Sequence, residues 1–94
     1  MPRRIMNVVG SSKDDVPNNI LECWEKYTKI EQDGCSVIDC PNKKLNGCHV
    51  IFIDEDKDKQ YIIPMCDSHN AQDKPFEIYD YVKKMPVEEL KKYL

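Results

Sequence analysis

The sequence lacks several features that mark membrane and secreted proteins. Its longest uninterrupted apolar run is Val50–Ile53. Glycine and tryptophan are also scarce, with three and one residues. A membrane span needs about 20 apolar residues, so we expect no membrane partner. No apolar stretch of about 7–15 residues follows the basic start at Arg3–Arg4, so we expect no signal peptide. These absences predict a cytoplasmic protein.

Positive charge is also scarce. Lys and Arg number 14 against 17 Asp and Glu, which gives a formal net charge of −3 and an isoelectric point near 5.3. Dedicated nucleic-acid binders usually have values above about 9. Any nucleic-acid contact must therefore use a local basic patch. The alternative is that the pairs of adjacent basic residues are ordinary solvated surface residues and bind no nucleic acid. The dibasic pairs are Arg3–Arg4, Lys43–Lys44, Lys83–Lys84 and Lys91–Lys92.

The chain length of 94 residues predicts one small domain over 1–94 with a thin core. We expect the core over about 20–82 and a flexible segment over 1–16. Cores of this size often need a disulfide or a metal ion to hold them. The chain has five cysteines, an odd number, and thiols stay reduced in the cytoplasm. Metal binding is therefore favoured over disulfides.

The apolar pattern in the first half predicts mainly one helix. A helix is expected over 17–33, because apolar residues recur near one face and Gly34 follows the last of them. That face comprises Ile20, Trp24, Tyr27 and Ile30. Before it we expect at most a short strand over 5–9.

The second half predicts strands and a second helix. Two strands over 49–53 and 61–63 flank a charged loop, and Pro64 ends the second strand. A short helix follows residue 66, and alternation predicts a strand over 76–82. A C-terminal helix starts at Pro86 and packs on the protein's own core or on a partner, the first being favoured. Its apolar stripe comprises Val87, Leu90, Tyr93 and Leu94.

Two pairs of potential ligands carry the strongest chemical signal. Cys35 and Cys40 form a C-x4-C pair, and Cys66 and His69 form a C-x2-H pair 25 residues later. Zinc prefers four thiolate or imidazole ligands in a tetrahedron, which two short pairs on tight turns can supply. The spacing predicts a structural Zn²⁺ site on these four residues. The alternative is four unrelated buried side chains.

The remaining cysteines and the other histidine compete for roles. Cys48 and His49 are adjacent, and neighbours on a strand point to opposite faces, so at most one can reach the zinc site. Cys23 lies beside Trp24 on the first helix, and a buried free cysteine behaves as a small apolar side chain. We expect it to belong to the core.

The segments Gly47–Val50 and Tyr61–Asn70 resemble the HNH, or ββα-metal, zinc-finger group. They are more closely similar to small bacterial and phage proteins with G-A-H-V, a hairpin, Y-I-V-P-L-C-x-x-C-N and an upstream C-x4-C. The resemblance covers roughly residues 20–80. It implies an α+β fold, a small zinc-stapled treble clef (HNH-like ββα) with an N-terminal and a C-terminal helix. His69 stands where those proteins have a fourth cysteine.

The same resemblance implies candidate catalytic residues. His49 matches the histidine that is the general base of active HNH nucleases, and Asn70 stands where a helix histidine holds the catalytic ion. Cys48 and Tyr61 replace a hard-metal ligand and the asparagine that orients the base, and thiols are poor ligands for Mg²⁺. The resemblance therefore implies a retained scaffold with its catalytic metal site mostly lost.

Three functions follow from the sequence. The first is a structural-zinc module that is not expected to be an enzyme, contacts nucleic acid or another protein as a monomer and has no small-molecule substrate. The second is a metal-dependent HNH-type nuclease with His49 as general base, aided by Asn70 and a carboxylate such as Asp54. The third is a thiol-redox protein that uses Cys23 or Cys48.

Overall fold

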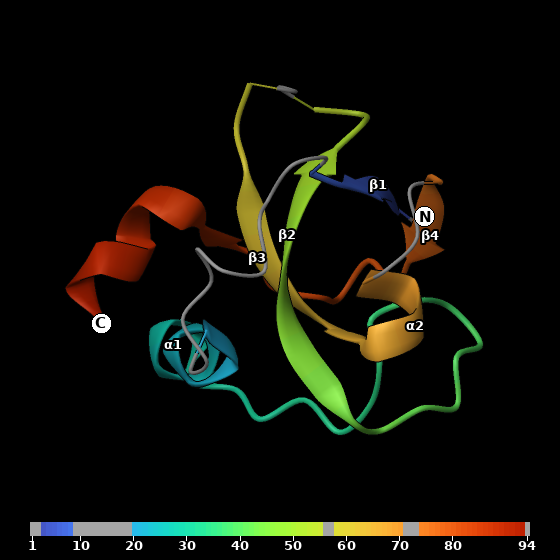
Figure 1. Ribbon diagram of the computed structural model, residues 1–94, viewed down its shortest axis with the longest axis horizontal. Helices are drawn as coiled ribbons and strands as arrows, with labels where there is room; N and C mark the ends of the chain where they lie inside the picture. Colours follow the sequence, from blue (N-terminus) through green and yellow to red (C-terminus); the bar gives the residue numbers. More distant parts are fainter. Residues whose placement is uncertain (1–2, 9–19, 56–57, 71–73, 94) are drawn as a thin grey trace.

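The computed structural model describes residues 3–8, 20–55, 58–70 and 74–93. It is an α+β fold around an antiparallel five-stranded sheet with the order β4-β1-β2-β3-β5 (Figure 1). The strands are β1 (Arg3–Asn7), β2 (Leu45–Phe52), β3 (Tyr61–Cys66), β4 (Phe76–Ile78) and β5 (Met85–Pro86). The helices are α1 (Ile20–Thr28), α2 (Asp67–Asn70) and the 3-10 helix η2 (Val87–Lys92).

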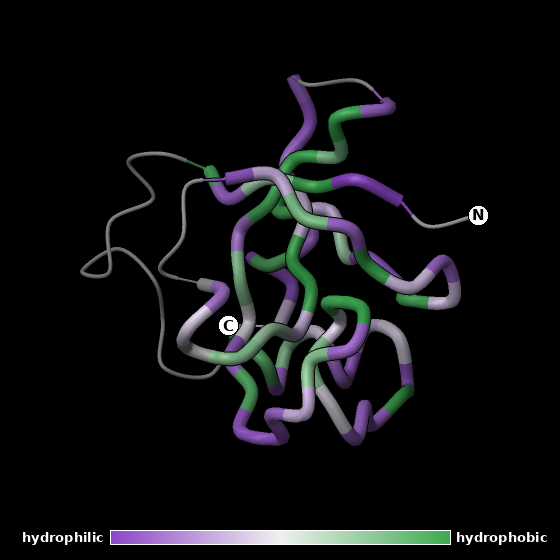
Figure 2. Tube along the Cα trace, turned by 90° about the vertical axis from the view of Figure 1, so that its right-hand side faces the viewer, coloured by the Kyte–Doolittle hydropathy of each residue, from purple (hydrophilic) through white to green (hydrophobic). Residues whose placement is uncertain are grey.

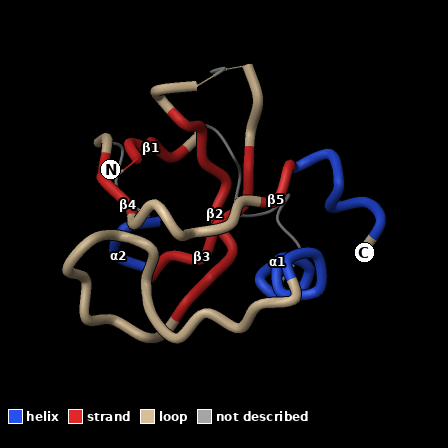
Figure 3. The backbone as a smooth tube through the Cα atoms, turned by 180° about the vertical axis from the view of Figure 1, so that it is seen from behind, coloured by secondary structure: helices blue, strands red, loops and turns tan. Residues whose placement is uncertain are grey.

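The sheet separates two groups of helices. α1 and η2 lie together on one side, and α2 lies on the other side near β4 (Figures 1 and 3). The trace coloured by hydropathy shows hydrophobic segments along the inner strands and many hydrophilic residues in the outer loops (Figure 2). The sheet thus contributes to two cores, one against α1 and one toward the cysteines.

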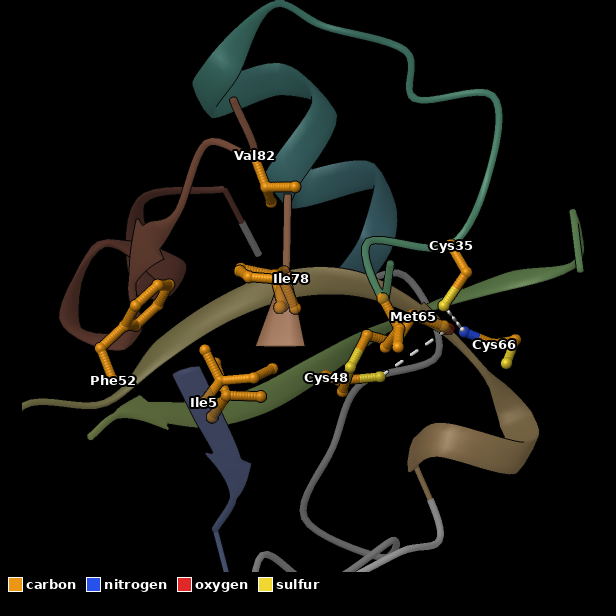
Figure 4. Close-up of a cluster of buried hydrophobic side chains, with 11 residues drawn as sticks. Ile5, Cys35, Cys48, Phe52, Met65, Cys66, Ile78 and Val82 are labelled. Atoms are coloured by element: carbon orange, nitrogen blue, oxygen red, sulfur yellow. Dashed lines mark hydrogen bonds between the residues drawn. The ribbon is translucent and has the colours of Figure 1, made fainter. Parts of the chain in front are cut away.

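Each core is a cluster of buried apolar side chains. The cluster against α1 and η2 comprises Ile20, Cys23, Trp24, Ile62, Met85 and Leu90. The second cluster, drawn in Figure 4, comprises Ile5, Cys35, Val37, Cys48, Val50, Phe52, Ile63, Met65, Cys66, Ile78 and Val82. Two of the predicted zinc ligands therefore belong to the core itself.

The sequence predicts the β2–β3 hairpin but makes both strands too short. β2 begins four residues before the predicted position 49, and β3 ends three residues after the predicted position 63. Gly47 lies in the added part of β2. A Cβ atom there would lie only 2.9 Å from the backbone nitrogen of Leu21. The missing side chain lets α1 lie directly on β2.

The prediction that Pro64 ends its strand is wrong. Pro64 lies opposite Gly47 in the hairpin, and its carbonyl oxygen accepts hydrogen bonds from the backbone N–H and hydroxyl of Ser36 at 3.2 and 2.5 Å. The amide and carbonyl of one residue point to the same side of a strand. The side of Pro64 on which other residues carry an N–H therefore faces Ser36, and the β2–β3 ladder loses no hydrogen bond.

The helix predicted over 17–33 ends early. Its first three residues lie outside the described ranges, and α1 ends at Thr28. Lys29, not Gly34, takes the left-handed position after the helix, with φ 61°. The N–H of Ile30 donates to the hydroxyl of Thr28 at 3.2 Å, which satisfies the backbone beyond the helix end. Ile30 therefore leaves the expected apolar face and is 39% exposed.

β1 places the N-terminal segment inside the sheet. The sequence predicts a strand over 5–9 in a flexible segment 1–16, and a core over about 20–82. β1 instead pairs with both β2 and β4, and Ile5 is fully buried opposite Phe52. The buried core therefore reaches further toward the N-terminus than expected. The later part of the segment lies outside the described residues.

The strand predicted over 76–82 is also shorter, since β4 ends at Ile78. Beyond it the N–H of Tyr79 donates to the carbonyl of Ser36 at 3.1 Å, and the N–H of Val82 closes a turn to Tyr79 at 3.3 Å. Beyond β4 the chain therefore leaves the sheet and lies against the turn that carries Cys35 and Cys40.

The C-terminal helix packs on the protein's own core, as favoured from the sequence. It is a 3-10 helix, whose three residues per turn align Val87, Leu90 and Tyr93 toward α1. The same geometry brings Lys92 beside Glu89, three residues earlier, and the two form an ion pair at 2.7 Å. None of the helices in the described ranges has the length and hydropathy of a transmembrane span.

Candidate metal centre

The structure brings together all four residues that the sequence predicts as metal ligands. Cys35 and Cys40 lie on the turn between α1 and β2, Cys66 ends β3, and His69 lies in α2. One ligand atom from each of the four residues lies within 4.8 Å of the other three. The short pairs therefore meet in space, although 25 residues separate them in sequence.

The distances resemble the edges of a zinc tetrahedron. Ligands bound at about 2.0–2.3 Å to one zinc ion lie about 3.6–3.8 Å apart. The Sγ atoms of Cys40 and Cys66 are 3.8 Å apart, and Sγ of Cys35 lies 3.8 Å from Nδ1 of His69. Sγ of Cys66 lies 3.1 Å from the same nitrogen, which is shorter than such an edge. Nδ1 is thus the histidine atom presented to the cluster.

Backbone hydrogen bonds shape the turn that holds the first pair. The N–H of Cys40 donates to the carbonyl of Val37 at 3.2 Å, and the N–H of Cys35 donates to the carbonyl of Asn42 at 3.1 Å. Asp39, inside the turn, has φ 64°, a left-handed conformation that Asp tolerates better than most residues. These bonds hold both thiols on the inner side of the turn.

The ligands are themselves supported by neighbouring groups. The backbone N–H of Cys66 donates to Sγ of Cys35 at 3.4 Å (Figure 4), and the side-chain amide of Asn42 donates to Sγ of Cys66 at 3.5 Å. The ring of His69 packs edge-to-face on Phe76, with centroids 5.3 Å apart. N–H donors to sulfur favour the thiolate, the form that binds metal.

The two buried thiols differ in acidity. Burial raises the pKa of Cys35 to about 11, although hydrogen bonds from backbone N–H groups oppose it. Burial also acts to raise the pKa of Cys66, but hydrogen bonds from the His69 backbone and from the Asn42 and His69 side chains outweigh it and lower that pKa to about 6. Cys66 is therefore the thiol most ready to bind a cation as thiolate.

The donor set fits a structural zinc ion better than a hard cation. Three thiols and one imidazole suit zinc, whereas Mg²⁺ and Ca²⁺ prefer oxygen ligands. Cys35 and Cys66 are 4% and 2% exposed, which favours a closed site with a structural role. Three thiolates and one Zn²⁺ leave a local charge of −1.

Two supporting residues were not predicted from the sequence. Asn42 donates to a ligand sulfur, and the side-chain amide of Asn7 donates to the carbonyl of His69 at 2.7 Å. Asn7 is 9% exposed. A polar residue in the otherwise apolar segment Ile5–Val9 was the signal that could have found it.

The competing candidates lie outside the ligand group. Cys48 is 1% exposed, and its Sγ lies 3.9 Å from the carbonyl of Met65 (Figure 4). His49 lies in β2 opposite Ile62, and its Nε2 is buried without a hydrogen-bond partner among the described residues. Burial lowers the pKa of His49. Asn70 is the last residue of α2, and its side chain lies outside what the structure describes.

Cys23 belongs to the core, as the sequence predicts. It is fully buried, and its thiol donates to the carbonyl of Tyr93 at 3.5 Å, which ties α1 to the end of η2. All five cysteines lie in described ranges, and all are free thiols.

Comparisons with protein families, curated proteins and solved structures find no match to this chain.

Proposed function

We propose that the protein is a structural-zinc module of treble-clef type, HNH-like but without a working nuclease site, that contacts nucleic acid or another protein. Cys35, Cys40, Cys66 and His69 would hold the ion. The observation that carries the proposal is the convergence of these four ligand atoms within 4.8 Å. The ion would supply cross-linking between two turns, not chemistry on a substrate.

The order of elements supports the treble-clef assignment. A cysteine-bearing turn, the β2–β3 hairpin and the short helix α2 follow one another along the chain, with ligands on the turn and at the start of the helix. The same order underlies the resemblance to HNH-like zinc fingers. The free thiols suit the reducing cytoplasm that we propose as its location.

Energetics favour a metal that stabilises the fold. Structural zinc contributes about 10–16 kcal/mol of binding free energy in small zinc-finger peptides. A whole domain is usually stable by only about 5–15 kcal/mol. Since Cys35 and Cys66 are also buried members of the main core, losing the ion would leave two ligand thiols without their metal inside that core.

The position of His49 argues against a nuclease. A general base must reach the proton that it removes. Nε2 of His49 is buried, and burial lowers its pKa, which further weakens it as a base. The structural role of the fold is therefore the better supported function.

Native mass spectrometry of the reduced protein, before and after a chelator, tests the proposal. We expect one zinc ion per chain and loss of the far-ultraviolet and near-ultraviolet circular dichroism when it is removed. A chain that is metal-free as purified and unfolds at the same urea concentration with or without added zinc contradicts the proposal. In parallel, plasmid DNA with Mg²⁺ or Mn²⁺ should stay uncut, and cutting abolished by His49→Ala would favour the nuclease instead.

A further inference from the structure

A cleft of about 440 Å³ lies beside the metal centre. Its lining includes the ligands Cys35 and Cys40, the loop over 30–34 and the segment over 79–83. Ligand sites in proteins usually have about 300–1,000 Å³, so the cleft is large enough for one extended side chain and the backbone that carries it. Neither the fold nor the zinc proposal uses this space.

One wall of the cleft is a pair of stacked tyrosines. The rings of Tyr79 and Tyr81 are 5.1 Å apart between centroids and inclined by 18°, and Tyr81 is 65% exposed. The hydroxyl of Tyr79 accepts a hydrogen bond from the N–H of Asp39 at 3.0 Å, and its own N–H donates to Ser36 at 3.1 Å. The cysteine-bearing turn thus fixes the inner ring, and the outer ring presents a flat face.

Another part of the cleft lining is acidic. Glu31 and Asp33 are exposed and line the cleft on a loop that Gln32 holds, since its amide donates to the carbonyl of Gly34 at 2.6 Å. Among the described residues, Lys83 is the one basic residue in the lining. Two acidic residues against one basic residue give these side chains of the lining a net negative charge, which suits a cation.

We propose that this cleft binds an arginine side chain of a partner protein, with its guanidinium over Tyr81 and paired with Glu31 and Asp33. A planar guanidinium stacks on an aromatic ring and pairs with carboxylates, which a compact ammonium does less well. Two carboxylates repel the negative charge of a phosphate backbone, so nucleic acid is the less suitable occupant. The inference rests on the proposed function in one respect, since zinc would hold the turn that fixes Tyr79.

Trp24 provides a direct readout. It is the only tryptophan in the chain and lines the cleft from its buried position. The zinc-loaded full chain is titrated with acetyl-Gly-Arg-Gly-Arg-Gly-amide while tryptophan emission and heteronuclear NMR shifts are followed. The control peptide carries citrulline in place of arginine, because citrulline has nearly the same shape and no charge. We expect saturable binding of the arginine peptide, with shifts around the cleft, and at least about tenfold weaker binding of the control.

Three variants test the aromatic, acidic and basic residues of the cleft lining. Tyr81→Ala should weaken peptide binding about threefold through loss of stacking, and the double variant E31Q/D33N should weaken it about fivefold or more. Lys83→Gln should strengthen it about twofold, because it removes the opposing charge. Glu88→Gln, an exposed acid on η2, is the matched control and should change nothing.

The opposite pattern overturns the proposal. Equal binding of the arginine and citrulline peptides, or tighter binding of a ten-residue oligothymidylate that Lys83→Gln weakens, contradicts an arginine site. Zinc content is measured on every sample. Arginine-dependent binding by a chain that holds no zinc leaves this inference standing and refutes the proposed function, whereas zinc-loaded protein without such binding refutes this inference alone.

Discussion

The side-chain amide of Asn7, in the N-terminal strand, donates a 2.7 Å hydrogen bond to the backbone carbonyl of His69, in the ligand helix α2. The two residues are 62 positions apart. Because the bond holds the short helix against β1, it sets where the imidazole of His69 lies relative to the three sulfur atoms. The metal centre is therefore connected to the middle of the sheet as well as to its own two turns.

Replacing Asn7 by Ala should weaken this connection. Loss of a buried hydrogen bond costs about 1–3 kcal/mol, and support to a metal ligand also contributes to metal affinity. We expect a lower free energy of unfolding in urea and faster transfer of zinc to a chromogenic chelator. Arg4→Gln, at an exposed position of the same strand, is the control and should match the parent protein in both measurements.

Two cysteine variants should separate ligand from core. Cys66→Ser removes a ligand and should abolish stable zinc binding and leave the chain unfolded, measured by native mass spectrometry and circular dichroism. Cys48→Ala removes a buried thiol outside the ligand group, so it should keep one zinc ion and lose only about 1 kcal/mol of stability. A folded, metal-free Cys66→Ser protein would refute a structural role for zinc.

Gly47→Ala should destabilise the protein by about 1–3 kcal/mol or more. The new Cβ would meet the Ile20 side chain and lie 2.9 Å from the backbone nitrogen of Leu21, and a helix backbone cannot move aside alone. Gly34→Ala is the control, since its nearest neighbour would be 4.0 Å away. Thermal unfolding of the zinc-loaded pair gives the comparison, and similar midpoints for both variants would contradict close contact between α1 and β2.

His49 should make stability depend on pH. Burial lowers its pKa below the ordinary value of 6.5, so the unfolded chain binds the proton more readily than the folded chain. Stability should therefore fall as the pH drops below about 6.5, by up to about 1.4 kcal/mol per pH unit until the folded pKa is reached. We expect His49→Ala to stay folded and to show a shallower fall between pH 7 and pH 5.5 in urea unfolding. Parallel curves for the two proteins would show that His49 does not carry this dependence.

The ligand set could be predicted because the two members of each ligand pair are close together in the sequence. Each pair lies on one turn, so the spacing from Cys35 to Cys40 and from Cys66 to His69 already places both members on the same side. What spacing could not supply was the support around them. Asn7 and Asn42 act through contacts with residues distant in sequence. A local pattern can mark Asn7 as an unusual polar position, but it does not identify the partner.

The errors in the fold have local physical causes. The predicted helix ran past Thr28 because apolar periodicity continues to Ile30, whereas the left-handed Lys29 ends it. Pro64 predicts a strand end because proline lacks the N–H that a sheet uses, but in this strand that side of Pro64 faces Ser36 and not β2. The depth of β1 could not be predicted, since the strand partners of Ile5, which are Phe52 and Phe76, lie more than 40 residues away.

The strand order β4-β1-β2-β3-β5 has a consequence for how the chain reaches this structure. β1 leaves the ribosome first, but its partners Phe52 and Phe76 are synthesised much later. Until then β1 lacks the two strands that flank it in the sheet, and the entropic cost of closing such long loops makes folding slow. The hairpin and the ligand turns close over far shorter distances. If residues 35–69 bind zinc as we propose, metal capture would precede completion of the sheet and provide the template on which β1 and β4 dock.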